Sequence, residues 1–184
     1  MKTRTLSPGT LRSVLLCVLL AVSAVTLTAA KPVPPIGHEP TGSETWEDVG
    51  MLRGFEAPEQ VWSAGTRGVQ LKAAKGDAVV APVDGVVSFV GKVAGRPVIA
   101  IRLPSGWRTT IEPVDATVTK GQHVTAGERI GTVASGGPCD QRCVHWGLKT
   151  GSGANVTYKD PRTLLSKQPS VLWPDANTPP RARR

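Results

Sequence analysis

The sequence has no segment in which apolar residues recur at the spacing of an α-helix over a useful length. This absence argues against a fold built on helices. What the chain has instead is a series of short runs of the kind that form strands, broken by glycine and proline. The runs at 69–73, 78–81 and 83–90 are rich in valine, and further runs lie at 97–103, 107–112, 129–134 and 144–149. Such runs predict an all-β fold, as an antiparallel sheet, sandwich or barrel.

Long apolar runs are also missing, apart from one at 13–27. Three basic residues precede this run, and the small residues Thr28-Ala29-Ala30 follow it. The run is shorter than the roughly 20 apolar residues that cross a bilayer. We therefore interpret residues 1–30 as a cleaved secretory signal, and an uncleaved membrane anchor is the alternative. The protein is then exported to the cell wall, the periplasm or the medium.

The excess of basic residues gives the full chain a net charge of +8. Removal of residues 1–30 takes away three basic residues and no acidic one, so the charge falls from +8 to +5. Arg181, Arg183 and Arg184 contribute three of these charges at the extreme C-terminus. In an exported protein they favour contact with anionic envelope polymers rather than nucleic acid. A solubilising tail explains them equally well.

Cysteine is scarce, and only Cys139 and Cys143 lie outside the signal. An oxidising compartment favours a disulfide between them, and zinc binding by the two thiolates is the alternative. The loop is very small, so the disulfide should contribute less than the ~3 kcal/mol expected for a 15-residue loop. We interpret the pair as a local staple.

Proline is concentrated at the two ends of the mature chain. We predict a proline-rich linker at 31–57 with one packed turn at its end, a β domain at 58–167, and a proline- and arginine-rich tail at 168–184. Each arm contains a tryptophan, Trp46 or Trp173, which gains little from full exposure and can pack back on the domain.

One part of the β region repeats. Lys75-Gly76 with Val79 and Ala81 recurs 45 residues later as Lys120-Gly121 with Val124 and Ala126. Each copy is a turn followed by a glycine-marked strand. We interpret the pair as an internal duplication.

Five segments together carry a resemblance to a known family: residues 64–71, 80–87, 124–131, 143–147 and 158–161. In this order and spacing they resemble the lysostaphin/LytM-type zinc endopeptidases, which cut the peptide cross-bridges of bacterial peptidoglycan. The resemblance implies an antiparallel β-sheet or sandwich of the duplicated-hybrid-motif, barrel-sandwich-like type. The biotinyl/lipoyl carrier sandwich also resembles residues 81–87, but the chain lacks a lysine in the mid-domain turn at 104–107.

The family's site residues fall on positions that have mostly changed. Its zinc-binding histidine and aspartate fall on Thr66 and Gln70, and its other zinc-binding histidine is retained as His145. One catalytic histidine falls on Cys143 and the other near Pro113. Zinc needs three nitrogen, thiolate or carboxylate ligands. The resemblance therefore implies no cofactor, and a site without its metal.

Three functions follow from these observations. The first is an exported pseudopeptidase that binds peptidoglycan or regulates a wall hydrolase. The second is a residual zinc metalloendopeptidase that uses His145, Glu112 and a reduced Cys143. The third is a structural envelope protein whose fold separates two proline-rich arms. We expect Glu112 at the surface, and His38 and His123 as solvent-exposed residues outside the site.

Overall fold

The computed structural model describes residues 30–60, 63–137 and 142–165. The predicted signal, the C-terminal tail with its three arginines, Cys139 and Trp173 therefore lie outside the described residues. Within them, regular structure is almost entirely β, with two short 3-10 helices, η1 (Gly153–Asn155) and η2 (Pro161–Leu164). In this part of the chain no helix combines the length and the apolar character needed to cross a membrane.

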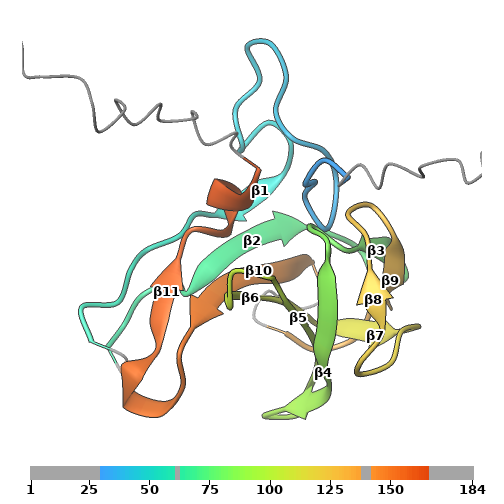
Figure 1. Ribbon diagram of the computed structural model, residues 1–184. Helices are drawn as coiled ribbons and strands as arrows, with labels where there is room; N and C mark the ends of the chain where they lie inside the picture. Colours follow the sequence, from blue (N-terminus) through green and yellow to red (C-terminus); the bar gives the residue numbers. More distant parts are fainter. Residues whose placement is uncertain (1–29, 61–62, 138–141, 166–184) are drawn as a thin grey trace, which may run out of the picture.

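The larger of two sheets contains eight strands, in the order β1-β2-β10-β6-β5-β4-β8, with β11 also paired to β10 (Figure 1). The strands are β1 (Met51–Arg53), β2 (Gly68–Lys72), β10 (Cys143–Thr150), β6 (Arg108–Glu112), β5 (Arg96–Arg102), β4 (Gly85–Val93), β8 (His123–Val124) and β11 (Thr157–Lys159). The smaller sheet has the order β3-β9-β7, with β3 (Ala78–Val80), β9 (Arg129–Val133) and β7 (Val114–Ala116). Every pairing is antiparallel, which confirms the predicted fold class.

Each of the seven runs overlaps a strand of the structure. The Pro104-Ser105-Gly106 segment makes the expected hairpin between β5 and β6, and Leu103 donates its N–H to the carbonyl of Trp107 at 2.8 Å. Four strands of only two or three residues have no counterpart in the predicted runs: β1, β7, β8 and β11. Runs this short carry no period that a sequence can reveal.

The core lies between the two sheets and is built from alternate positions of the strands. On β10, Val144, Trp146 and Leu148 are all buried, and Trp146 has no exposed surface. A side chain of this size needs a partner for its indole N–H when it is buried. Thr109 on β6 supplies it, accepting from Nε1 of Trp146 at 2.8 Å and donating to the carbonyl of Gly147 at 3.1 Å. These two hydrogen bonds link β10 to β6 on the side of the sheet that faces the core.

The repeat detected in the sequence is also a structural repeat. Gly76 and Gly121 occupy matching turns, and both have a φ of 93°, a conformation that favours glycine. Gly76 donates its N–H to Val133 in the second copy at 2.9 Å, and Gly121 donates to Val87 in the first copy at 2.8 Å. Each turn therefore closes on a strand of the other copy, as expected if a strand-turn-strand unit was duplicated.

Residues 31–57, which we expected to form an extended linker, lie along the β domain. Val33 donates its N–H to the carbonyl of Pro82 at 2.9 Å, and Val80 donates to the carbonyl of Pro35 at 3.1 Å. Strand β1 then adds to the edge of the large sheet by pairing with β2. Trp46 packs against the core, with the guanidinium of Arg162 5.8 Å from the centre of its ring.

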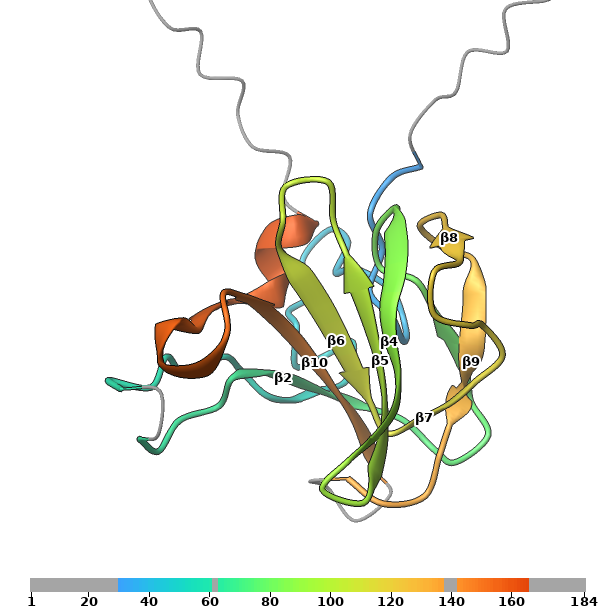
Figure 2. The same ribbon diagram turned by 60° about the horizontal axis from the view of Figure 1, so that its bottom comes forward.

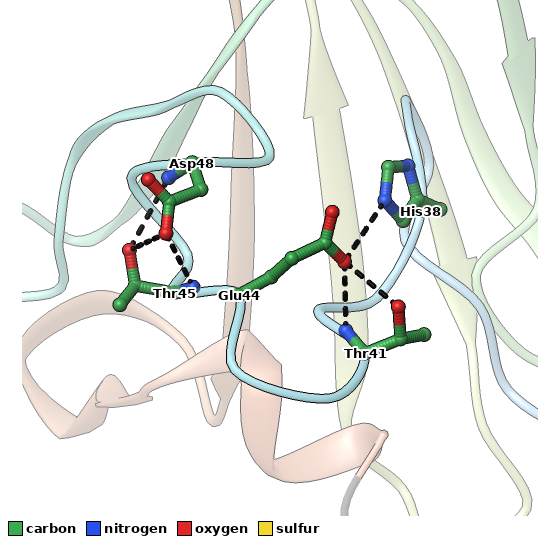
Figure 3. Close-up of polar contacts among 5 residues, drawn as sticks. All are labelled: His38, Thr41, Glu44, Thr45 and Asp48. Carbon is green, nitrogen blue, oxygen red and sulfur yellow. Dashed lines mark hydrogen bonds and ion pairs between the residues drawn. The ribbon is translucent and has the colours of Figure 1, made fainter.

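Two consecutive turns shape this N-terminal segment (Figure 3). Glu44 accepts hydrogen bonds from the backbone N–H and the hydroxyl of Thr41, and Asp48 accepts the same pair from Thr45. These hydrogen bonds, chiefly the one from the backbone N–H in each case, lower the pKa of both carboxyls. Nε2 of His38 lies 3.6 Å from Oε2 of Glu44, and His38 is exposed, as expected. The segment thus folds through local side-chain to backbone bonds.

Candidate functional site

The face of β10 opposite the core carries His145, Gly147 and Lys149. Side chains alternate between the two faces of a strand, so the burial of Val144 and Trp146 in the core directs these three residues to the other face. Figure 2 shows this strand between β2 on one side and β6 on the other. The candidate site is built on these central strands rather than on loops.

His145 lies in a row of three residues that crosses three adjacent strands. In the pairing of β10 with β2 it is opposite Gln70, and in the pairing of β10 with β6 it is opposite Glu112. Directly opposed side chains in an antiparallel sheet have Cβ atoms about 4.5–5.5 Å apart. The register therefore brings together an imidazole, an amide and a carboxylate.

Two glycines, Gly68 and Gly147, lie beside this row on the same surface of the sheet. Gly68 pairs with Gly147, and a Cβ built on Gly68 would come within 2.8 Å of Nε2 of His145 and 2.2 Å of the Trp146 carbonyl oxygen. A Cβ on Gly147 would come within 2.8 Å of the Thr110 hydroxyl. The imidazole thus occupies space that only glycine leaves open.

A second row lies four residues further along β10. Lys149 is opposite Arg108 on β6 and opposite Tyr158 on β11. At about 3.3 Å per residue, His145 and Lys149 are roughly 13 Å apart along the strand. A pocket of about 180 Å³ is lined by both of them, together with Glu112 from the first row and Tyr158 from the second.

The pocket is lined by residues of both charge signs and by apolar groups: Arg67, Val93, Arg96, Val98, Thr110, Glu112, His145, Leu148, Lys149 and Tyr158. Three of these are cationic and one, Glu112, is acidic. Arg96 donates from Nε to a carboxylate oxygen of Glu112 at 3.3 Å. The guanidinium of Arg67 lies 5.6 Å from the centre of the Tyr158 ring, and its Nη2 donates to the Ser63 carbonyl at 3.0 Å. After the Arg96–Glu112 pair, positive charge remains in excess.

Burial lowers the pKa of two of these groups. Desolvation lowers the pKa of His145, an effect that Arg96 reinforces and the nearby Glu112 carboxylate opposes. The imidazole is therefore neutral at pH 7. Desolvation also lowers the pKa of Lys149, and the adjacent Arg108 lowers it further, while the Glu112 carboxylate opposes both effects. Both shifts have a common cause, because each side chain is held partly out of water beside another cation.

The predicted ligand positions differ in how the structure places them. Gln70 and His145 are neighbours, as described above, but only His145 lines the pocket. Thr66 is buried, with 5 % of its surface exposed, and pairs through its backbone with Glu56. Its hydroxyl has no hydrogen-bond partner among the described residues. Cys143 is also buried and lies opposite Lys72.

The expectation that Glu112 is a surface residue is wrong. Only 16 % of its side chain is exposed, because it is the last residue of β6 and faces His145 and Arg96. Of the segment 111–113, Ile111 points into the core, Glu112 lines the pocket, and Pro113 is buried beside Gly137.

The remaining pocket residues were missed in the sequence analysis. Arg67, Arg96, Lys149 and Tyr158 come from four separate segments, and nothing in their local sequence marks them as a group. Only the strand register brings them together. His123 lies on β8, is exposed, and does not line this pocket, in agreement with its expected place outside the site.

The residues present do not fit a catalytic zinc ion. In the described parts of the chain, no group of three histidine, cysteine, aspartate or glutamate side chains is arranged to hold a metal. Thr66 and Gln70 provide neutral oxygen atoms in place of an imidazole and a carboxylate. The cations that line the pocket add repulsion for a divalent metal ion. Of the three predicted zinc-ligand positions, His145 alone carries a side chain that commonly binds zinc.

Relatives of this chain were found by sequence. A protein of Mycobacterium tuberculosis with no characterised function is 41 % identical over 126 residues, which are 67 % of this chain and 51 % of the relative. A Mycobacterium bovis protein gives the same values. The chain spans about half the length of the curated relatives that it matches.

Solved structures share the fold. The catalytic domain of the antimicrobial peptidase lysostaphin from Staphylococcus simulans is 22 % identical, with a TM-score of 0.56 over 65 % of this chain and 94 % of that domain. A catalytic-domain variant of the prophage-encoded M23 protein EnpA from Enterococcus faecalis is 20 % identical, with a TM-score of 0.52 over 70 % of this chain and 94 % of that chain. The sequence profile of peptidase family M23 matches residues 64–158, more than half of the chain. The chain therefore belongs to peptidase family M23.

Proposed function

We propose that this protein is an exported pseudopeptidase, which binds peptides of the bacterial cell wall or regulates a wall hydrolase without cleaving peptide bonds itself. Membership of peptidase family M23 supports a role at the wall. The basic sequence at the N-terminus and its apolar run support export. The fold supplies a pocket on a rigid sheet, which is a suitable platform for recognition.

The observation that carries this proposal is the charge of the pocket. Hydrolysis by a zinc enzyme needs a metal that lowers the pKa of bound water, together with a base. Here the pocket around the surviving His145 contains Arg67, Arg96 and Lys149, and its one carboxylate is paired with Arg96. Cations in place of acidic ligands disfavour the metal and favour an anionic or polar ligand.

A zinc-dependent peptidase is the second candidate, because Glu112 lies directly opposite His145 and is partly buried. Glutamate can serve as a zinc ligand or as a base. Against this role, Glu112 is paired with Arg96, which competes with a metal for the carboxylate. The two candidates differ in whether the purified protein contains zinc.

Metal content and wall binding, measured on the same preparation, test the proposal. Protein purified without chelator should contain far less than one zinc per chain, should not release peptides from purified sacculi, and should be retained on sacculi or by an exported wall hydrolase. Zinc near one equivalent, with hydrolysis that is lost on chelation, would establish the second candidate. Retention on neither partner would overturn the binding role.

We also propose that Cys143 is joined to Cys139 in the exported protein. Cys143 is buried at the start of β10, two residues before His145. Export into an oxidising compartment supports a disulfide rather than a pair of thiols. Such a staple would hold the segment that leads into β10, and it would prevent Cys143 from transferring protons.

A further inference from the structure

We propose that the pocket beside His145 is a binding site for the terminal carboxylate of a peptide. Its anion-binding groups are the guanidinium of Arg67 and the ammonium of Lys149, which line the same pocket. The inference rests on the function proposed above and narrows it, because it names the chemical group of the wall peptide that the site recognises.

The arrangement of the basic groups supports this role. Lys149 on β10 lies between Arg108 on β6 and Tyr158 on β11, so three adjacent strands bring it to one place. Arg67 stacks over the ring of Tyr158, which orients its guanidinium next to the same strand pair. Lys149 is held on a central strand and is therefore pre-organised, so little conformational entropy is lost when it binds an anion.

The charge balance of the pocket is incomplete without a ligand. Arg96 already has Glu112 as its partner at 3.3 Å. Lys149 forms no ion pair within the described residues, although it is partly buried and adjacent to Arg108. Clustered, partly desolvated cations are costly unless an anion joins them. A carboxylate in the pocket would relieve this repulsion and accept charge-assisted hydrogen bonds.

The apolar part of the surface favours a peptide over a phosphate polymer. Val93 and Val98 line the pocket, and Val93 is 49 % exposed. Next to them on β4, Phe89 is 38 % exposed, and its ring lies over Gly91. Small apolar side chains of a peptide can cover such groups and gain from their burial. A phosphate polymer has no apolar group to place there.

The test is a titration of isotope-labelled protein with N-acetyl-D-alanyl-D-alanine, followed by NMR. The free acid should shift the resonances of Lys149 and Glu112 in a saturable way. The C-terminal amide of the same dipeptide should bind at least tenfold more weakly, because it lacks the charge. Inorganic phosphate, titrated separately, should bind more weakly than the acid.

Matched variants show whether Lys149 binds the carboxylate. Lys149→Met should weaken binding of the acid at least tenfold, Lys149→Arg should keep it within a few fold, and Lys75→Met, which removes an exposed turn lysine, should leave it unchanged. If Lys149→Met does not fold, the comparison of acid with amide on the unaltered protein still decides.

Three outcomes overturn the inference: equal binding of acid and amide, no saturable binding of the acid, or tighter binding of phosphate than of the acid. Retention on sacculi, measured in parallel, separates this failure from a failure of the proposed function. If the protein is retained on sacculi but does not prefer the carboxylate, the proposed function stands and only the inferred carboxylate site is refuted.

Discussion

Glu112 lies directly opposite His145 in the antiparallel pairing of β6 with β10, and the guanidinium of Arg96 is bound to the same carboxylate. The pairing places a titratable imidazole beside a carboxylate and a cation in a partly buried pocket. Desolvation outweighs the carboxylate, so the pKa of His145 is lowered in the folded protein. The protonation of this histidine is therefore linked to stability.

The first prediction concerns that linkage. Below the ordinary histidine pKa of 6.5 the unfolded chain binds a proton that the folded chain does not, so the free energy of unfolding should fall as the pH decreases through this window. Each unit of difference between the histidine pKa in the unfolded chain and that in the folded protein changes the free energy of unfolding by about 1.4 kcal/mol. Urea unfolding at pH 7.5 and pH 5.5 should show a smaller loss for His145→Asn than for the unaltered protein. Equal losses of stability in the two proteins would contradict the assignment of this pH dependence to His145.

The second prediction concerns the support behind the site. Thr109→Val removes the hydroxyl that accepts from the Trp146 indole, and both residues are fully buried. An unpaired buried donor costs about 1–3 kcal/mol, so the midpoint of denaturant unfolding should fall accordingly. Thr109→Ser is the matched control, since it keeps the hydroxyl and should recover much of the stability. A Val variant as stable as the Ser variant would show that this bond contributes nothing.

The third prediction concerns the cost of the cationic pocket. The pKa of Lys149 is lowered by desolvation and by Arg108, so the charged form destabilises the fold at every pH below that lowered pKa. Lys149→Met should therefore raise the free energy of unfolding, and with it the thermal midpoint, at pH 7. The gain should be small, because solvent screens a side chain that is still half in water. Lys75→Met, at an exposed turn, should change it little. A destabilised Lys149→Met protein would show that the lysine is held by favourable contacts.

The fourth prediction tests the assigned ligand positions. Thr66→His combined with Gln70→Asp should create a three-ligand zinc site with His145, because Gln70 already lies opposite His145. Zinc at one hundred times its dissociation constant should then stabilise the protein by about 2.7 kcal/mol. Gln70→Asp alone supplies one ligand fewer and serves as the control. A folded double variant that binds zinc no better than the unaltered protein would refute the assignment.

The fifth prediction concerns the cysteines. Mass spectrometry of exported protein before and after reduction should reveal one disulfide between Cys139 and Cys143. Cys143→Ala should then lower stability by less than ~3 kcal/mol, because so small a loop constrains the unfolded chain only modestly. Two free thiols under oxidising conditions would rule out the staple.

The sequence by itself determined the main strands, and its resemblance to the family predicts which site positions have changed. Runs such as 97–103 and 144–149 alternate or stay apolar for long enough to be recognised, and turn residues separate them. The motif around His145 was recognisable because its residues are neighbours in the chain. In contrast, β7 and β8 are too short to show a period, and they form because longer strands offer them an edge.

Only the tertiary structure decided what surrounds His145. Glu112 was expected at the surface because its sequence neighbours say nothing about which strand will face it. The register of β6 against β10 places Glu112 opposite His145. In the same way, the register of β10 against β11 places Lys149 opposite Tyr158. Register depends on the packing of the whole core behind the sheet, including Trp146 and Thr109. The local sequence thus allows a prediction of which metal ligands have changed, whereas only strand pairing reveals the cations in the pocket.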